Sequence, residues 1–188
     1  NMFSRRYPTI GGDPEFFIVK TIDGKGRRVN EIMSADKFLP PKNKKDKISA
    51  GEVFFDGVQA EINPNFSSCR ETFLSNVQIC LAEVFRNVVE KRDGNPELEG
   101  RYNFWTLASV DITKDTIKNT DLECRRFGCS PDFNVYTDKK IRYPDGNKFF
   151  IRFAGGHIHL GFPTIEDMKN MKTPEKLERL IKMLDALV

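Results

Sequence analysis

The stretch Gly155-Gly156-His157-Ile158-His159-Leu160-Gly161-Phe162 holds both histidines of the 188-residue chain, two positions apart and flanked by glycine. In a β-strand, side chains at positions i and i+2 share a face, so both imidazoles would point the same way. Ile158, Leu160 and Phe162 would face the core, and the glycines would leave room for a ligand. The pattern predicts a core strand with a polar functional face. Two hydrogen-bonded histidines that face water fit it equally well.

The composition predicts one domain over residues 1–188 with a core of its own. Hydrophobic residues make up 39% of the chain, and 16 residues are phenylalanine. The net charge is only +3, from 30 basic and 27 acidic side chains, so no global field favours nucleic acid or an anionic membrane. No apolar run approaches the roughly 20 residues that a membrane span needs. We therefore expect no nucleic-acid partner and no membrane partner.

The cysteines predict a reducing compartment. They stand at positions 69, 80, 124 and 129, without CxxC spacing, and no secretory leader is recognisable. We expect free thiols and a cytoplasmic location. The chain also ends inside a helical pattern that begins at Thr173-Pro174, and this pattern has no stop signal. We therefore expect the natural protein to continue beyond Val188.

A pair of acids opens the first predicted strand. Asp13 and Glu15 lie two positions apart on either side of Pro14, just before an apolar run. Pleating would aim both carboxylates the same way, and such a like-charged pair is tolerated best around a cation or strong donors. Proline restricts this part to the start or the edge of a strand. A solvated turn is the alternative interpretation.

A further acid lies on the strand predicted over residues 58–63. Val58, Ala60 and Ile62 alternate with Gln59, Glu61 and Asn63, which is the two-residue period of a half-buried strand. The polar face thus carries a carboxylate between two amides, which can orient it without competing for charge. This face suits a metal or a substrate. A strand with one solvated face explains the same pattern.

The remaining elements are predicted from periodicity. Residues 68–92 have helical spacing of apolar residues, with Ser68 and Glu71 as a capping box, and this helix should pack on one face of a sheet with Cys80 in its apolar stripe. Residues 102–112 are predicted to form one strand that is covered on both sides. The lysine-rich residues 40–47 predict a mobile loop, either solvated or in contact with phosphate or an acidic substrate.

A glycine-containing loop over residues 125–136 leads into another predicted strand. Asp132 would lie on its polar face, and Cys129 invites a nucleophile hypothesis, for which no base can be placed nearby. A hairpin turn over residues 143–147 and a return strand over residues 148–154 then lead to the histidine strand.

Together these acids and histidines favour a site for a hard divalent cation. Carboxylate oxygens with an occasional imidazole suit Mg²⁺ or Mn²⁺, whereas structural zinc would require thiolates or more imidazoles. The chain has no Walker loop and no GxGxxG motif. Phosphate would therefore have to be held by metal and basic side chains.

Four short motifs follow one another across the chain: Gly11-Gly12-Asp13-Pro14-Glu15-Phe16-Phe17, Asp56-Gly57-Val58-Gln59-Ala60-Glu61-Ile62-Asn63-Pro64, Phe127-Gly128-Cys129-Ser130-Pro131-Asp132-Phe133-Asn134 and Gly155-Gly156-His157-Ile158-His159-Leu160-Gly161. In this order they resemble the type 2 family of phage carboxylate-amine ligases, a distant branch of the glutamine synthetase and glutamate-cysteine ligase superfamily. The resemblance implies an α+β fold, in which helices pack on one face of a largely antiparallel, glutamine-synthetase-like sheet. It also implies that this catalytic domain is incomplete at its C-terminus, because the superfamily's acidic and arginine motif after the histidine strand is missing.

The resemblance also implies roles for individual residues. Asp13, Glu15 and Glu61 would bind magnesium, and His157 would bind both the metal and the ATP phosphates. His159 would face the acyl phosphate or the carboxylate substrate. Asp132 is a further metal ligand by its match to the phage branch. Three arginines could add positive charge for catalysis or nucleotide binding, although ordinary surface roles explain them as well: Arg125, Arg126 and Arg152.

The implied reaction uses ATP and Mg²⁺, or Mn²⁺, to activate a carboxylate as an acyl phosphate, which an amine then attacks to give an amide. The substrates would be small molecules or peptides. Two alternatives stay open from the residues alone. One is a metal-dependent phosphoesterase that uses the same acids and histidines to activate water. The other is a catalytically inactive relative retained as a binding or virion protein.

Overall fold

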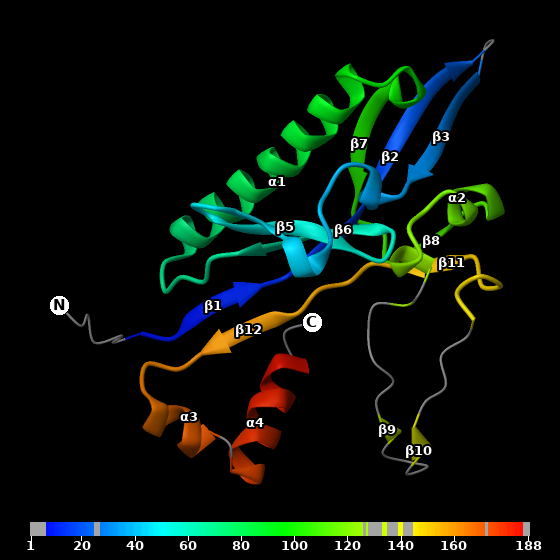
Figure 1. Ribbon diagram of the computed structural model, residues 1–188. Helices are drawn as coiled ribbons and strands as arrows, with labels where there is room; N and C mark the ends of the chain where they lie inside the picture. Colours follow the sequence, from blue (N-terminus) through cyan, green and yellow to red (C-terminus); the bar gives the residue numbers. More distant parts are fainter. Residues whose placement is uncertain are drawn as a thin grey trace.

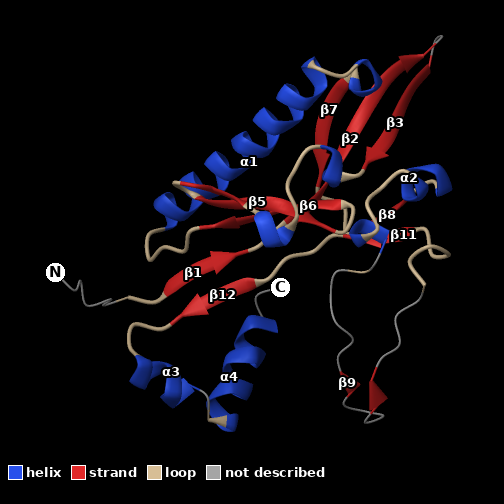
Figure 2. Cartoon of the chain, viewed as in Figure 1, coloured by secondary structure: helices blue, strands red, loops and turns tan. Residues whose placement is uncertain are grey.

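The computed structural model describes residues 7–24, 27–125, 127, 133–134, 139–140, 145–171 and 173–185. The fold is mixed α+β, with mostly antiparallel sheets and few helices, as predicted. A long helix lies along one face of the main sheet, and a two-stranded ribbon extends from the sheet toward two short C-terminal helices (Figures 1 and 2).

The main sheet has six strands: β2 (Glu15–Gly24), β3 (Arg27–Met33), β4 (Asp46–Ile48), β5 (Gly51–Asp56), β6 (Gln59–Pro64) and β7 (Arg101–Trp105). Their order is β3-β2-β6-β5-β4, and β7 also pairs with β2. Strand β2 is long enough to pair with β6 at its first two residues and with β3 and β7 further along. The chain therefore brings the start of β2 beside the β5–β6 hairpin.

Helix α1 (Arg70–Asp93) covers the face of β5 and β6 to which Ala60 and Ile62 point (Figure 1). It packs there through Cys80, Val84 and Val88, which are buried at helical spacing. The predicted helix, its place on one sheet face and the core position of Cys80 are confirmed.

The predicted capping box of α1 is wrong. The helix begins at Arg70, and no side chain caps its N-terminus. The Ser67 hydroxyl instead accepts a hydrogen bond from the backbone N–H of Cys69, and this local turn delays the helix start. The helix ends at Asp93 with Gly94 as its C-cap, and Asn95 then caps a short 3-10 helix, η3 (Pro96–Leu98).

The histidine strand is β12 (Ile158–Gly161), which pairs antiparallel with β1 (Thr9–Gly12). The prediction that it lies in the core is wrong, because Ile158 is 76% exposed and Leu160 is also exposed. Among the described strands, β12 pairs with β1 alone, and the described residues leave the apolar side of this ribbon open. The ribbon runs into the main sheet, because the N–H groups of Asp13 and Glu15 donate to the carbonyls of His157 and Gly155.

The single strand predicted over residues 102–112 is also wrong. Strand β7 ends at Trp105, and a second strand, β8 (Ser109–Asp111), pairs with β11 (Ile151–Phe153) in a separate sheet. Continued pairing of β7 with β2 would reach Glu15, but the N–H of Glu15 donates to Gly155. Strand β7 therefore stops pairing with β2 at the point where the segment before β12 pairs with β2 instead.

The other elements are short: η1 (Ala35–Lys37), η2 (Lys42–Lys44), α2 (Lys114–Lys118), η4 (Glu123–Arg125), β9 (Phe133–Asn134), β10 (Lys139–Lys140), α3 (Ile165–Met171) and α4 (Pro174–Asp185). The lysine-rich segment expected as a mobile loop thus contributes η2 and β4, and β4 pairs with β5. Helix α4 begins at Pro174, as predicted. Within the described part of the chain, no helix has the length and hydropathy that crossing a bilayer requires.

Candidate functional site

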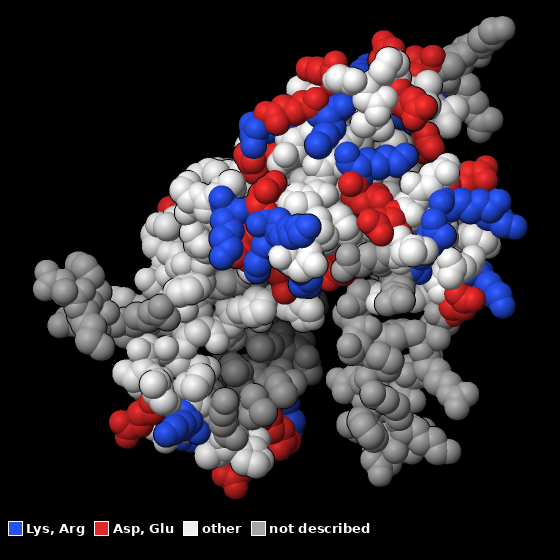
Figure 3. Space-filling view, in the orientation of Figure 1, with Lys and Arg blue, Asp and Glu red and all other residues white. Residues whose placement is uncertain are grey.

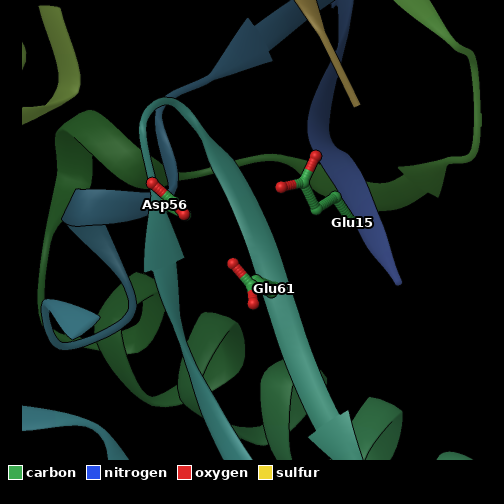
Figure 4. Close-up of side chains that lie close together, drawn as sticks. All are labelled: Glu15, Asp56 and Glu61. Atoms are coloured by element: carbon green, nitrogen blue, oxygen red, sulfur yellow. The ribbon is translucent and has the colours of Figure 1, made fainter. Parts of the chain in front are cut away.

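Three carboxylates from three strands meet on the sheet face opposite α1. Glu15 begins β2, Asp56 ends β5 and Glu61 lies on β6, and Figure 4 shows their side chains directed toward a common space. One ligand oxygen from each lies within 4.8 Å of the others. We call these three residues the carboxylate cluster.

Strand register explains why these residues meet. Glu15 stands directly opposite Glu61 across the β2–β6 pair, and Asp56 stands opposite Gln59 across the β5–β6 hairpin. Opposed residues share a face of the sheet, as do Gln59 and Glu61 two positions apart. The predicted alternation over residues 58–63 is therefore confirmed for Ala60, Ile62 and their polar neighbours.

The buried position of Glu61 dominates the electrostatics of the cluster. The residue is only 5% exposed, and this burial raises the pKa of its carboxyl to about 7. Lys42 lowers the pKa, while the negative charges of Asp56 and Glu15 raise it. Like charges placed directly opposite each other are unfavourable in a sheet, and the raised pKa of Glu61 reflects this repulsion in part.

Lys42 supplies positive charge to the cluster. Its Nζ lies 2.9 Å from Asp56 Oδ2 and 3.4 Å from Glu61 Oε2. Burial lowers the pKa of this ammonium, but the contacts with Asp56 and Glu61 outweigh burial and raise it. Lys42 is therefore charged in this position.

Gln59 and a backbone N–H hold the third acid in place. The Gln59 Nε2 group lies 3.5 Å from Glu15 Oε2 and donates to the Phe153 carbonyl at 3.0 Å. The Gly155 N–H donates to Glu15 Oε2 at 2.9 Å. Among the described residues, none forms a hydrogen bond with the buried Oε1 of Gln59. The prediction that the flanking amides orient Glu61 is wrong, because Gln59 contacts Glu15 and Asn63 contacts Glu52.

The histidines meet the other predicted acid, Asp13. The backbone N–H of His157 donates to Asp13 Oδ1, and the His157 Nδ1 atom lies 3.1 Å from the same oxygen. The His159 Nε2 atom lies 3.2 Å from Asp13 Oδ2. Burial raises the pKa of Asp13, but these hydrogen bonds outweigh burial and hold the pKa below its ordinary value. We call Asp13, His157 and His159 the histidine group.

The predicted site is therefore divided between two groups of residues. Asp13 and Glu15 were expected to share a cation, but Asp13 contacts the histidines whereas Glu15 belongs to the carboxylate cluster. Pro14 separates them between the end of β1 and the start of β2. Both imidazoles are exposed, in contrast to Glu61.

Arg152 is buried away from solvent and holds a turn. It is 2% exposed, and its guanidinium donates to the carbonyls of Phe149, Ile151 and Gly146. The group also lies over the Phe127 ring, 4.8 Å from its centre. Burial lowers the pKa of this guanidinium. These contacts point to a structural position, and the expected catalytic role stays a prediction.

Arg125 also binds backbone atoms. Its guanidinium donates to the carbonyls of Lys118 and Thr120, which ties η4 to the end of α2. Its expected role in nucleotide binding stays a prediction. Arg126, Asp132 and Cys129 lie outside the described residues.

Two members of the site, Asp56 and Lys42, were not predicted from the sequence. The Asp56-Gly57 pair is a hairpin-turn signal, and a two-residue turn would place Asp56 beside Gln59 and on the face of Glu61. Local sequence could therefore have revealed Asp56. No local signal distinguishes Lys42 from the other lysines of its segment, because its partners lie on distant strands.

The surface around these elements carries both signs of charge. In the face shown in Figure 3, Lys and Arg side chains lie next to Asp and Glu side chains over the part of the molecule that contains the main sheet. The face shown there therefore carries mixed charge.

No protein-family model matches the chain, and neither a curated protein nor a solved structure shows significant similarity to it.

Proposed function

We propose that this protein is an ATP-dependent carboxylate-amine ligase that uses Mg²⁺ or Mn²⁺ bound at the carboxylate cluster. The observation that carries the proposal is the meeting of Glu15, Asp56 and Glu61 within 4.8 Å on the sheet face opposite α1. Two of the four ligase-like motifs supply these three acids, and the histidine motif lies alongside the first of them. A glutamine-synthetase-like arrangement of the sheet is part of the same proposal.

The donor set of the cluster fits a hard divalent cation. All three ligands are carboxylates, and Mg²⁺ prefers oxygen ligands, commonly one or two carboxylates together with substrate phosphates. Glu15, Asp56 and Glu61 would hold the ion. When bound, the ion would neutralise the γ-phosphoryl group of ATP and the incoming carboxylate, which are both anions.

The histidine group would act on the substrate rather than on this ion. Asp13 accepts hydrogen bonds from the His157 backbone and fixes both rings from one side. The rings are otherwise open to solvent, so His157 can reach a phosphate oxygen and His159 an acyl oxygen of a bound substrate. Asp13 thus positions the two histidines. Asp13, which was expected to be a metal ligand, is therefore proposed here as a positioning residue.

Binding and turnover measurements test the proposal. Calorimetry with Mg²⁺ and ATP should show binding to the wild-type protein, and Glu61→Gln should weaken the metal-dependent part by more than about tenfold, because it removes a buried charged ligand. Glu52→Gln is the matched control, since Glu52 lies on the same hairpin and pairs with Lys45 instead. Absence of Mg²⁺-dependent nucleotide binding in the wild type would refute the proposal.

Phosphate release then separates ligation from hydrolysis. A ligase releases phosphate from ATP only when both a carboxylate and an amine are present, and it forms an amide in equal amount. Phosphate release that needs neither co-substrate would establish a phosphoesterase at the same cluster instead.

A further inference from the structure

The ammonium of Lys42 occupies the position beside two of the three clustered acids. It contacts Asp56 at 2.9 Å and Glu61 at 3.4 Å. Among the described residues, Lys42 is the one basic side chain within ion-pair distance of the carboxylate cluster. A divalent ion that used the same oxygens would have to displace it, because two cations cannot share them at contact distance.

The backbone that carries Lys42 is attached to the sheet, whereas its side chain is more than half exposed. Pro41 forms a bridge with Phe55, and the Phe55 N–H donates to the Pro40 carbonyl, so the segment before η2 is attached to β5. The Lys42 side chain is 56% exposed and lies over the Phe54 ring, 5.4 Å from its centre. The ammonium can therefore leave the acids by rotation of its own side chain.

A displaced Lys42 would remain next to the ion. A lysine is a flexible point charge with three donors, and it binds phosphate in many nucleotide sites. Magnesium sites of nucleotide enzymes combine a few carboxylates with the phosphate oxygens of the substrate. The released ammonium would then face the phosphate oxygens that enter with the ion.

We propose that Lys42 is an exchangeable cation. It neutralises Asp56 and Glu61 in the metal-free protein, gives way to the divalent ion and then binds a phosphate oxygen of the nucleotide. This inference rests on the proposed function, because it assumes that the cluster binds a metal–nucleotide complex. It assigns Lys42 a role in binding and gives the η2 segment a place in the site.

Lys42 would compete with the metal ion but would assist nucleotide binding, so its removal should have opposite effects on the two affinities. In Lys42→Met, Mn²⁺ alone should bind about fivefold tighter than to the wild type, since a competing cation worth about 1 kcal/mol is gone. A non-hydrolysable ATP analogue, added with saturating Mn²⁺, should bind about tenfold more weakly, because a charge-assisted contact to phosphate is lost. Electron paramagnetic resonance measures free Mn²⁺, and calorimetry measures the nucleotide.

Lys44→Met is the matched control. Lys44 lies on the same 3-10 helix and is exposed, and no contact joins it to the cluster. This variant removes the same charge from the same segment and should leave both affinities within about twofold of the wild type. Lys42→Arg keeps the charge and should bind Mn²⁺ as the wild type does. Thermal unfolding of all three variants identifies any loss of folding.

The outcomes separate this inference from the proposed function. If the wild type binds Mn²⁺ and nucleotide but Lys42→Met changes neither affinity, the exchange is refuted while the proposed function stands. Weaker Mn²⁺ binding in Lys42→Met, with Lys42→Arg unchanged, would show that Lys42 orders the ligands rather than competes with the ion. Failure of the wild type to bind Mn²⁺ would refute both.

Discussion

The carboxylate cluster and the histidine group are close in the chain at Asp13 and Glu15, but their environments differ. Glu15 and Glu61 stand on the main sheet, where α1 covers the opposite face, and Glu61 is almost fully buried. His157 and His159 stand on a two-stranded ribbon whose side chains are exposed. A preformed cluster with one buried carboxylate suits a cation, whereas exposed rings suit contacts that a substrate completes.

The largest expected difference between the two regions is in packing. Ile62 is fully buried beside Glu61, and Ile158 is 76% exposed between the histidines. Ile62→Ala should lower the free energy of unfolding by about 2–5 kcal/mol, because it leaves a cavity. Ile158→Ala should change it by less than about 0.5 kcal/mol. Urea unfolding measures both, and equal losses would show that the ribbon is covered in solution.

The next effect concerns pH. The pKa of Glu61 is raised from 4.5 to about 7, so the folded protein holds a proton that the unfolded chain releases. The associated stability is fully present below pH 4.5 and is lost as the pH rises through 7, by up to roughly 3 kcal/mol.

Glu61→Gln tests this dependence, because glutamine cannot ionise. The variant should lack the fall in unfolding free energy that the wild type shows between about pH 4.5 and pH 7. The same slope in both proteins would mean that Glu61 is not responsible. No corresponding fall is expected from Asp13, whose pKa shifts downward.

The smallest predicted effect lies in the glycine pair before the histidines. Gly156 has a φ of +154°, and a Cβ there would lie 3.0 Å from the Pro14 Cα, whereas a Cβ on Gly155 would meet nothing within 4 Å. Gly156→Ala should cost about 1–2 kcal/mol and Gly155→Ala less than about 0.5 kcal/mol.

A spectroscopic measurement links this pair to the histidine group. The imidazole NMR resonances of His157 and His159 should shift in Gly156→Ala, because the strand can no longer lie as close to Asp13. They should stay unchanged in Gly155→Ala. Unchanged spectra in both variants would contradict the view that Gly156 allows the histidine segment to lie close to Asp13.

Local patterns predicted the elements that depend on local physics. The period over residues 58–63 placed Glu61 opposite the core face, and helical spacing placed Cys80 inside. Local patterns could not predict that β12 is exposed, because exposure depends on which other parts of the chain pack against a strand. The division of Asp13 from Glu15 depends on the pairing of residues 155 and 157 with them. Lys42 could not be singled out, because Asp56 and Glu61 reach it through tertiary contacts.

Hydrogen bonds join side chains at the cluster to main-chain atoms of the segment before the histidines. Gln59 binds the carbonyl of Phe153, and Glu15 binds the N–H of Gly155. Any residue other than proline offers both groups, so these contacts tolerate most replacements of the side chains at positions 153 and 155. Sequence drift in this segment can therefore be extensive while the geometry of the acids is retained. The site would evolve mainly through Gln59 and the three acids.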